Sequence, residues 1–358
     1  MTPILRRRRG GIVGFGFIAE NGHLPAYRRD GELEIVAVAD VCAARREAAA
    51  KAMPGARIYE TGEAMIRDAG RDLDFVDITT PPYAHTAIAR AALEAGLHVL
   101  CEKPLAVTAA DARLTIEQAE RSKRVLFPVE NYRHAPVIVA VRNVLETGLI
   151  GNVHDVTLST FRNTHARGVK EWNESWRREK RFAGGGVAMD HGSHTFYLAF
   201  EWLRSYPTSI SAKMRTHGRY DTEDTFVGSA TFPTGFAAVH LTWTAGVRKV
   251  IYTLHGDRGA IRVEDDDIEV AVRGEPATDR APGRPAWELK TKKVASEWMD
   301  AGHAAWFRSM FGSFVTAMDE KEHVGRPAVD ALRCIELLET AYASAADSSR
   351  ELRIPRSG

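Results

Sequence analysis

Short runs of apolar residues alternate with stretches of helical period over the first third of the chain. The apolar runs cover residues 11–14, 34–39, 75–79, 98–101 and 125–127. Between them, apolar residues recur three and four positions apart, as on one face of a helix. Strands that alternate with amphipathic helices are typical of a parallel sheet with crossover helices. We therefore predict an α/β fold that begins with a doubly wound Rossmann domain over residues 1–128.

Two helices of this half carry signals at their ends. The helix expected over residues 83–95 is followed by Gly96, which can adopt the left-handed conformation that ends many helices. Thr108 and Asp111 have the spacing of a capping box and predict the start of the next helix.

The pattern changes after Pro136. A further helix stops near Gly148, and β-rich runs follow at residues 153–161, 209–217, 225–232, 236–244, 250–255, 260–263 and 268–272. The links at 233–235 and 257–259 have the length of hairpin turns, which favours antiparallel pairing. With a final helix over 327–345, residues 129–358 are predicted to form an α+β domain with a large, mostly antiparallel sheet. The polar segment 279–293 is expected to be a loop insertion without an assigned role.

The composition is that of an ordinary globular protein of two domains, with 358 residues, 44% of them hydrophobic and 27% charged. Lys and Arg number 48 and Asp and Glu 47, a net charge of +1, so no chain-wide field favours nucleic acid or an anionic membrane. No apolar run approaches the roughly 20 residues of a membrane-spanning helix. We expect neither nucleic acid nor a membrane as a partner.

The cysteines and the N-terminal residues indicate the cellular compartment of the protein. Cys42, Cys101 and Cys334 are an odd, widely spaced set, as expected for thiols in a reducing environment. The arginines at positions 6–9 are not followed by the apolar segment of a signal peptide, and we interpret them as a solvated lead-in to the first strand. A cytoplasmic protein is therefore expected.

A glycine-rich turn follows the first apolar run. It matches the pattern Gly-x-Gly-x-x-Gly/Ala between a strand and a helix, which predicts a dinucleotide site. The first glycine permits the tight turn, the second lets the backbone approach a pyrophosphate, and the small last residue lets the helix pack on the strand. The predicted cofactor-binding residues of this turn are Gly14, Phe15, Gly16, Phe17, Ile18 and Ala19.

Asp40 ends the second apolar run, 24 residues after Gly16, where an acid that accepts the ribose hydroxyls belongs. Its carboxylate would repel a 2′-phosphate, which favours NAD, although Arg45 and Arg46 could compensate and NADP stays open. The alternative role of Asp40 is that of a helix N-cap before Cys42, and the two roles are compatible.

Further candidates follow the next two apolar runs, at the edge where ligands gather in an open parallel sheet. Thr80, Pro81 and His85 come after the run at 75–79. Glu102 and Lys103 come after the run at 98–101, and Lys103 is expected to face the nicotinamide side of the crevice.

These motifs, in this order, resemble the family of glucose-fructose oxidoreductase, inositol dehydrogenase and rhizopine-catabolism proteins, usually written Gfo/Idh/MocA. The resemblance covers nearly the whole chain. It rests on the glycine turn with His23-Leu24-Pro25 after it, Thr80-Pro81-Pro82 with His85, Glu102-Lys103-Pro104, and Gly184-Gly185-Gly186 followed by Asp190 and His194.

The resemblance implies a two-domain NAD(P)-dependent oxidoreductase that acts mostly on sugars, cyclitols and their derivatives. It also implies a homodimer or homotetramer built through the sheet of the second domain. The family's catalytic lysine falls on Lys103, and its aspartate and histidine fall on Asp190 and His194.

The residues themselves agree with this assignment. Asp190 and His194 are four apart and would share one face of a helix that opens after the glycines. A histidine that titrates near neutrality suits the transfer of a hydroxyl proton, so His194 is the expected general acid/base. Lys103 would stabilise negative charge on the reacting oxygen, and Asp190 would orient the substrate or His194. In isolation the three would be better explained as a turn lysine, a capping acid and a core histidine, but their shared order favours catalysis.

A metal site is not expected. Asp190, His191 and His194 stand close together, but no second cluster has helical His/Glu spacing. The three aspartates at 265–267 lack the rest of a calcium loop and are interpreted as a solvated hairpin.

The segment between residues 161 and 184 bears on the substrate. Residues 162–181 hold seven Lys/Arg against three Glu, a net charge of +4, with weak periodicity. Beside a sugar-sized cleft this suggests a substrate with a carboxylate or phosphate, and stacking of Trp172 and Trp176 on a pyranose. A solvated surface helix with two packing tryptophans is the alternative. The expected substrate-binding residues are Lys103, Trp176, Arg177, Asp190 and His194, and Asn131 is expected to approach the nicotinamide.

The sequence thus predicts an NAD(P)-dependent dehydrogenase or ketoreductase that acts on a secondary alcohol or ketone of a sugar, amino sugar, nucleotide sugar or cyclitol. Two alternatives stay open. One is a glycosidase that uses bound NAD for transient oxidation, and the other is a module that binds the dinucleotide without catalysis.

Overall fold

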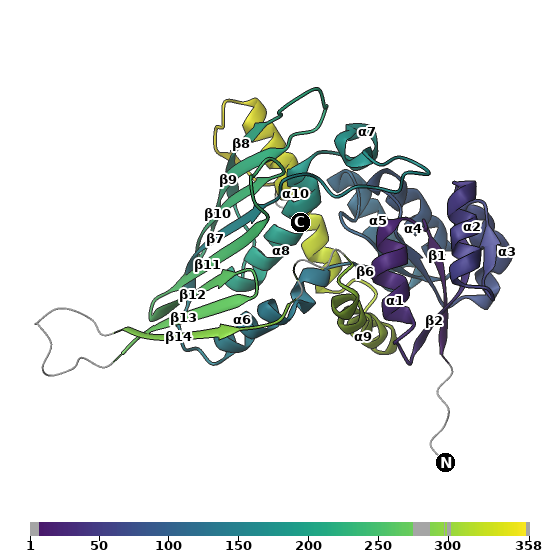
Figure 1. Cartoon of the computed structure of the whole chain (residues 1–358), viewed down its shortest axis with the longest axis horizontal. Coiled ribbons are helices and arrows are strands. Elements are labelled where there is room, and N and C mark those ends of the chain that lie inside the picture. Colours follow the sequence, from purple (N-terminus) through teal and green to yellow (C-terminus); the bar gives the residue numbers. More distant parts are fainter. Residues whose placement is uncertain (1–6, 275–286, 297, 299–301, 356–358) are drawn as a thin grey trace, which may run out of the picture.

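The computed structural model describes residues 7–274, 287–296, 298 and 302–355, and its two sheets lie in separate halves of the molecule (Figure 1). The first sheet is parallel, with the order β3-β2-β1-β4-β5-β6 of a doubly wound fold. The order reverses between β1 and β4, which makes the crevice at their carboxyl ends the expected ligand site. The strands are β1 (Arg8–Val13), β2 (Leu33–Ala39), β3 (Arg57–Tyr59), β4 (Phe75–Ile78), β5 (His98–Cys101) and β6 (Leu126–Pro128).

Helices connect these strands across both faces of the sheet. Both predicted end signals are confirmed: Gly96 has φ +81° after α4, and Thr108 Oγ1 accepts the N–H of Asp111 (3.1 Å) at the start of α5. After β1 the chain forms a π-helical turn, η1, before a one-turn helix, α1. The bounds are η1 (Ala19–His23), α1 (Leu24–Tyr27), α2 (Ala43–Ala52), α3 (Gly62–Ala69), η2 (Gly70–Asp72), η3 (Pro82–Ala84), α4 (His85–Glu94) and α5 (Ala109–Ser122).

The second sheet has nine strands in the order β14-β13-β12-β11-β7-β10-β9-β8-β15. β7 and β10 run parallel, and the other neighbours are antiparallel. Buried residues alternate with less buried ones along β9 and β11, as expected for a sheet covered on one face. The strands are β7 (Val153–Phe161), β8 (Ser209–Arg215), β9 (Thr225–Phe232), β10 (Gly235–Thr242), β11 (Lys249–Gly256), β12 (Gly259–Glu264), β13 (Asp267–Arg273), β14 (Trp287–Lys293) and β15 (Leu352–Arg353).

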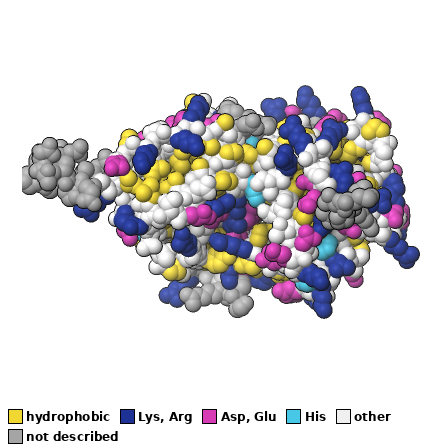
Figure 2. Space-filling view, turned by 90° about the horizontal axis from the view of Figure 1, so that it is seen from below, with side chains coloured by type: hydrophobic (Ala, Val, Ile, Leu, Met, Phe, Trp, Pro, Cys, Tyr) yellow, Lys and Arg dark blue, Asp and Glu magenta, His cyan; other side chains and the backbone are white. Residues whose placement is uncertain are grey.

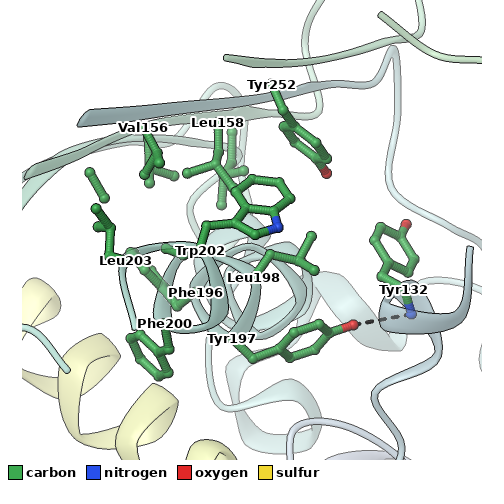
Figure 3. Packing of buried hydrophobic residues seen from close by; sticks show 14 of the residues in the cluster. Tyr132, Val156, Leu158, Phe196, Tyr197, Leu198, Phe200, Trp202, Leu203 and Tyr252 are labelled. Carbon is green, nitrogen blue, oxygen red and sulfur yellow. Dashed lines mark hydrogen bonds between the residues drawn. The ribbon is translucent and has the colours of Figure 1, made fainter. Parts of the chain in front are cut away.

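Helices α6 (Pro136–Glu146), α8 (Val187–Leu203) and α10 (Arg326–Ala346) lie on the face of this sheet that is turned toward the first half (Figure 1). Helix α8 is buried on nearly all sides because it lies between the sheet and α10. Figure 3 shows Trp202 of α8 packed beneath Leu158 and Tyr252 of the sheet. The predicted fold class, a Rossmann sheet followed by an α+β half with a mostly antiparallel sheet, is confirmed.

Helix α9 (Ala304–Glu320), which was not among the predicted elements, returns to the first half (Figure 1). Phe307, Phe311 and Phe314 pack with Phe15 and Phe75 in a core beside the parallel sheet. The two halves therefore share part of a core, and the division at residue 128 stays a prediction.

Two expectations about strands are wrong. β1 begins at Arg8 rather than at residue 11. Arg8 is therefore part of a strand and not of a solvated lead-in, and it forms an ion pair with Asp319 of α9. Residues 287–293, expected in a loop insertion, form β14, because the edge of β13 offers backbone hydrogen bonds even to a polar segment. The rest of that segment, residues 279–286, lies outside the described residues.

The aspartate hairpin, the surface charges and the length of the helices complete the description of the fold. The aspartates at 265–267 lie at the hairpin between β12 and β13, as predicted. Basic and acidic side chains are interspersed over the face shown in Figure 2. In the part of the chain that the structure describes, no helix combines the length and apolar character needed to cross a membrane.

Candidate active site

A cavity of about 710 Å³ lies between the two halves, at the carboxyl ends of the parallel strands. The first half contributes the glycine turn and the segments after β2, β4 and β5, as the strand order predicts. The second half contributes the loop around residues 162–177, one face of α8, and residues 243, 248 and 303. The predicted site residues that line the cavity are Gly14, Gly16, Phe17, Ile18, Asp40, Thr80, Pro81, Glu102, Lys103, Asn131, Trp176, Arg177, Asp190 and His194.

Three predicted residues lie behind the cavity wall. Phe15 and Ala19 are fully buried in the apolar core, Ala19 as expected for the residue that lets the helix pack on the strand. The His85 ring is also buried, with Nδ1 2.8 Å from the main-chain oxygen of Pro104 and Nε2 2.7 Å from that of Thr80. His85 therefore ties together the loops after β4 and β5, and its contribution to the cofactor site is indirect.

The glycine turn leaves its backbone accessible. Gly14 has φ +93°, and a Cβ on it would lie 2.8 Å from the side chain of Thr80. Around the position of a Cβ on Gly16, no atom of the described residues other than Gly16 and its two chain neighbours lies within 4 Å. The cavity thus has open space where the motif requires a pyrophosphate.

Asp40 is held at the mouth of this turn. Its carboxylate accepts the N–H of Phe15 (2.6 Å) and the N–H of Cys42 (2.8 Å). The N-cap residue of α2 is Cys42, so Asp40 stabilises the loop before the helix and does not cap it. Each carboxylate oxygen keeps a lone pair for a ribose hydroxyl.

Two buried polar atoms in the cavity wall fit a bound dinucleotide. Thr80 Oγ1 and Asn131 Oδ1 have no hydrogen-bond partner among the described residues, and both residues line the cavity. Buried polar groups normally have partners, so these two oxygens are free to bind polar groups of a ligand. With the open turn and Asp40, the donor set fits NAD.

A buried histidine supports the loop that carries Lys103. His23 Nδ1 lies 2.7 Å from Asp77 Oδ2, and Nε2 lies 3.1 Å from Glu102 Oε1. Burial alone would lower the pKa of His23, but the two carboxylates more than offset it and raise the pKa to about 9. Glu102 Oε2 in turn accepts the N–H of Lys103 (3.1 Å). Asp77 was not identified from the sequence because it is a single polar residue inside a buried strand.

Lys103 and Asp190 join the two halves inside the cavity. Lys103 Nζ donates to Asp190 Oδ1 (2.6 Å) and to the main-chain oxygen of Asp190 (3.0 Å). Arg177 Nε lies 3.5 Å from the same Oδ1. Burial would raise the pKa of Asp190, but Lys103 and Arg177 hold it well below its usual range. Asp190 is therefore ionised at neutral pH.

His194 lies one turn after Asp190 on α8, and the same cavity borders it. Its Nδ1 is 2.9 Å from Tyr197 Oη, and this oxygen accepts the N–H of Tyr132 at 3.2 Å (Figure 3). Among the described residues, Tyr197 has no acceptor for its hydroxyl proton other than Nδ1. His194 therefore carries its own proton on Nε2.

The ionisation of His194 differs from the expectation. Burial, followed by the nearby Lys103 and His191, holds the pKa of His194 well below its usual value. The ring of Tyr132 also stacks on it, with the centroids 3.9 Å apart. His194 is a neutral hydrogen-bond donor at pH 7 and not a group that titrates near neutrality.

The glycines before α8 let the helix start against Glu223. Glu223 Oε1 accepts the N–H of Gly186 (3.0 Å) and of Ala188 (2.9 Å), and the hydroxyl of Tyr342 donates to it (2.9 Å). A Cβ on Gly186 would lie 1.8 Å from the main-chain oxygen of Glu223. This carboxylate satisfies the free N–H groups of the helix start and so sets the position of Asp190. Glu223 lies in an irregular segment, where no periodicity could mark it.

The loop after β7 is irregular, as predicted, apart from η5 (Trp176–Arg178) and α7 (Lys180–Ala183). It reaches the first half: Cys42 Sγ donates to the main-chain oxygen of Glu171 at 3.4 Å. The Arg177 guanidinium covers one face of Trp176 at 4.1 Å, and Trp172 packs edge-on against Phe182. Both tryptophans therefore line the cavity and also pack against a neighbouring side chain, Trp176 against Arg177 and Trp172 against Phe182.

In the described part of the chain, no group of three or more His, Cys, Asp or Glu is placed to hold a metal ion. The residues around Asp190 and His191 are instead dominated by cations.

The chain is similar to known oxidoreductases. Residues 8–130 match the family model described as an oxidoreductase family with an NAD-binding Rossmann fold, and residues 142–353 match the model of its C-terminal alpha/beta domain. The chain is 39% identical to D-apiose dehydrogenase of Paraburkholderia graminis, over 72% of this chain and 64% of that protein. It is 31% identical to 1,5-anhydro-D-fructose reductase of Ensifer adhaerens, over 82% of this chain and 89% of that protein.

A solved structure shows the same fold. The oxidoreductase from Agrobacterium radiobacter in complex with NAD+, L-tartaric acid and magnesium matches with a TM-score of 0.82 and 21% identity, over 98% of this chain and 99% of that chain. The two matched models cover the Rossmann half and the C-terminal α/β half of the chain. The chain therefore belongs to the Gfo/Idh/MocA family of NAD-binding oxidoreductases.

Proposed function

We propose that this chain transfers hydride between NAD and a secondary alcohol or ketone carbon of a sugar, amino sugar, nucleotide sugar or cyclitol. The observation that carries the proposal is the ion pair of Lys103 with Asp190, which joins the two halves inside the cavity at the glycine turn. The names of the two similar proteins, D-apiose dehydrogenase and 1,5-anhydro-D-fructose reductase, support a sugar substrate.

NAD, when bound, supplies the hydride acceptor or donor. The backbone of the glycine turn would hold its pyrophosphate, and Asp40 would accept hydrogen bonds from the ribose hydroxyls. Thr80, Pro81 and Asn131 would lie toward the nicotinamide, where Thr80 and Asn131 have the buried unpartnered oxygens.

The arginines near Asp40 support NAD over NADP. Arg46 donates to the main-chain oxygens of Asp40 and Val41. Arg45 donates to the main-chain oxygen of Phe15 and pairs with Glu20. Because both guanidinium groups are engaged, neither compensates the repulsion between Asp40 and a 2′-phosphate.

Lys103 is placed to move the proton. Its ammonium has three N–H groups, and two of them are bound to Asp190, which leaves the third for the reacting oxygen. When a ketone is reduced, Lys103 donates a proton to this oxygen as hydride reaches the carbon, and oxidation runs in reverse. His194 donates from Nε2 to the same oxygen and stabilises its negative charge. A histidine whose pKa lies well below its usual value is a poor proton acceptor at pH 7, so we assign the proton transfer to Lys103 and not to His194, the group expected from the sequence.

The test combines a substrate panel with one variant. Purified protein is mixed with NAD+ or NADP+ and with polyols, sugars, sugar acids and nucleotide sugars, and the absorbance of the reduced nicotinamide is followed. We expect turnover with a lower KM for NAD+ than for NADP+. Lys103→Met should lower kcat by about a hundredfold or more. Lys51→Met, the same change at an exposed position of α2, is the control and should leave kcat unchanged.

Wild-type turnover in Lys103→Met would refute the proposal. Cleavage of a glycoside without net formation of NADH would favour the glycosidase alternative. Tight NADH binding without turnover of any compound would favour the binding module.

We also propose that the protein self-associates through the open face of the nine-stranded sheet and works in the cytoplasm. Phe236 and Val227 are exposed on the face opposite α8 and α10, where an apolar surface favours association. Free thiols at all three cysteines support a reducing compartment. Light scattering should find a dimer or tetramer that Phe236→Asp dissociates; a monomeric wild-type protein would contradict this.

A further inference from the structure

We propose that the substrate of this cavity carries an oxyanion, either a carboxylate or a phosphate, and that Arg162 binds it. The inference rests on the proposed function and names the class of sugar derivative that the site accepts. A guanidinium group recognises both oxyanions through paired N–H donors, so a sugar acid and a sugar phosphate share the relevant chemistry.

Arg162 is held rigidly at the end of β7. Its N–H donates to the main-chain oxygen of Thr242 (2.8 Å), and its own main-chain oxygen accepts the N–H of Ala245 (2.9 Å). The residue is 8% exposed and lines the cavity. The side-chain hydrogen bond of its guanidinium group runs from Nη1 to the main-chain oxygen of Phe161 (3.1 Å).

The charge of Arg162 is not compensated within the described part of the chain, where no carboxylate lies within ion-pair distance of its guanidinium group. The two other arginines with similar burial do have such partners. Arg45 pairs with Glu20, and Arg178 Nη1 lies 3.7 Å from Asp224. A buried unpaired cation is costly, so a site that retains one is built for a counter-charge that comes from outside the chain.

The groups around Arg162 add positive charge. Lys103 and Arg177 share the carboxylate of Asp190, so these two cations and Arg162 exceed that one anion by two charges. Arg248 also lines the cavity, and burial followed by the charge of Arg162 lowers its pKa. These same cations surround His191: burial, Arg162, Lys103 and Arg177 lower its pKa to about 3 against the opposing effect of Asp190. His191 is therefore neutral and does not change the surplus.

A neutral donor completes the site. His165 is 8% exposed and lines the cavity, and its Nδ1 accepts a hydrogen bond from Arg178 Nε (3.2 Å). Its proton is therefore on Nε2, which is buried without a partner in the described part of the chain. Burial and the nearby Arg178 lower the pKa of His165 to about 4, so it is neutral at pH 7. Arg162 and His165 thus offer charge and an unused N–H to an oxyanion.

The experiment compares one sugar in three charge states. D-glucose, D-glucuronate and D-glucose 6-phosphate are tested as substrates with NAD+, and their binding to the wild-type protein saturated with NADH is measured by calorimetry. We expect glucuronate or glucose 6-phosphate to bind, or to react, about a hundredfold better than glucose. The preferred compound of the two identifies the oxyanion as carboxylate or phosphate.

Variants locate the effect. Arg162→Gln should lower binding and kcat/KM for the preferred anion about a hundredfold and change those for glucose less than about threefold. Arg162→Lys keeps the charge but loses the paired donors, and should retain part of the preference. Arg29→Gln, the same change at an exposed position, is the control.

The inference is overturned if wild-type protein binds glucose as well as or better than both anions, if no compound shows charge-dependent binding, or if Arg162→Gln affects glucose and the anions equally. Calorimetry separates this failure from failure of the proposed function: binding of an anion without formation of NADH would support the oxyanion site and contradict hydride transfer. Turnover of neutral sugars alone would do the opposite. If Arg162→Gln does not fold, the wild-type comparison and Arg162→Lys still decide.

Discussion

Replacing Tyr197 with phenylalanine would remove one oxygen atom from the contact between α8 and η4 (Asn131–His134). That oxygen accepts the N–H of Tyr132 at 3.2 Å (Figure 3). It also lies 2.9 Å from His194 Nδ1. The ring would keep its place, because Tyr197 is buried and the Arg133 guanidinium lies 5.0 Å from the ring centroid. The variant therefore tests the hydroxyl group alone.

The magnitude follows from the two groups that lose their partner. Tyr132 N–H and His194 Nδ1 would both stay buried, and each unsatisfied buried group costs about 1 to 3 kcal/mol. The free energy of unfolding should thus fall by about 2 to 6 kcal/mol. The lower half of this range is expected, since the lost hydroxyl no longer has to be desolvated.

Catalysis should change as well. Without the hydroxyl, nothing holds the proton of His194 on Nε2, so the donor to the reacting oxygen is present only part of the time. We expect kcat to fall about tenfold, which corresponds to about 1.4 kcal/mol in the barrier, with a smaller change in KM.

Urea unfolding and steady-state kinetics measure the two effects. Tyr220→Phe removes a hydroxyl from a half-exposed ring and is the matched control. If Tyr197→Phe and Tyr220→Phe have the same free energy of unfolding and the same kcat, the proton arrangement assigned to His194 is wrong. If stability falls and kcat does not, the hydroxyl is structural only.

Three further predictions concern the cofactor turn, the start of α8 and the buried histidine. Asp40→Asn should lower the ratio of KM for NADP+ to KM for NAD+ by at least about tenfold, because it removes the charge that repels a 2′-phosphate; an unchanged ratio would contradict the role of Asp40. Gly186→Ala should lower the melting temperature and kcat together, because its Cβ would lie 1.8 Å from the main-chain oxygen of Glu223. A variant with the wild-type melting temperature and kcat would show that α8 can move to accommodate the Cβ without loss of stability or activity. The pKa of His23 is raised from 6.5 to about 9, so its ionisation contributes stability that is fully present below pH 6.5 and is lost as the pH rises through 9, on the order of 3 kcal/mol. Urea unfolding at pH 6.5 and 9.5 should detect this loss of stability. An NMR titration of the imidazoles should find one histidine that stays protonated to about pH 9. If every histidine titrates below pH 7, the prediction is wrong.

The amino-acid sequence by itself determined the order of the elements and most of the cofactor half of the site. Strand and helix periods are local, because they reflect which face of each element is buried. Gly14, Asp40 and Lys103 could be found because each lies within two residues of the end of a strand, and parallel strands bring their carboxyl ends to one edge of the sheet. The polar β14 carries no such local signal. Helix α9 does, because its buried residues recur three and four positions apart, but it was not among the predicted elements.

The tertiary structure alone decided which distant groups meet and how they are charged. Lys103 and Asp190 are 87 residues apart in the chain, and only the packing of α8 against the sheet and Glu223 places them 2.6 Å from each other. The lowered pKa of His194, the raised pKa of His23 and the uncompensated Arg162 arise from desolvation and from neighbours on other elements. Burial and charge depend on the whole surroundings of a side chain in space, and a residue's neighbours along the chain do not specify those surroundings.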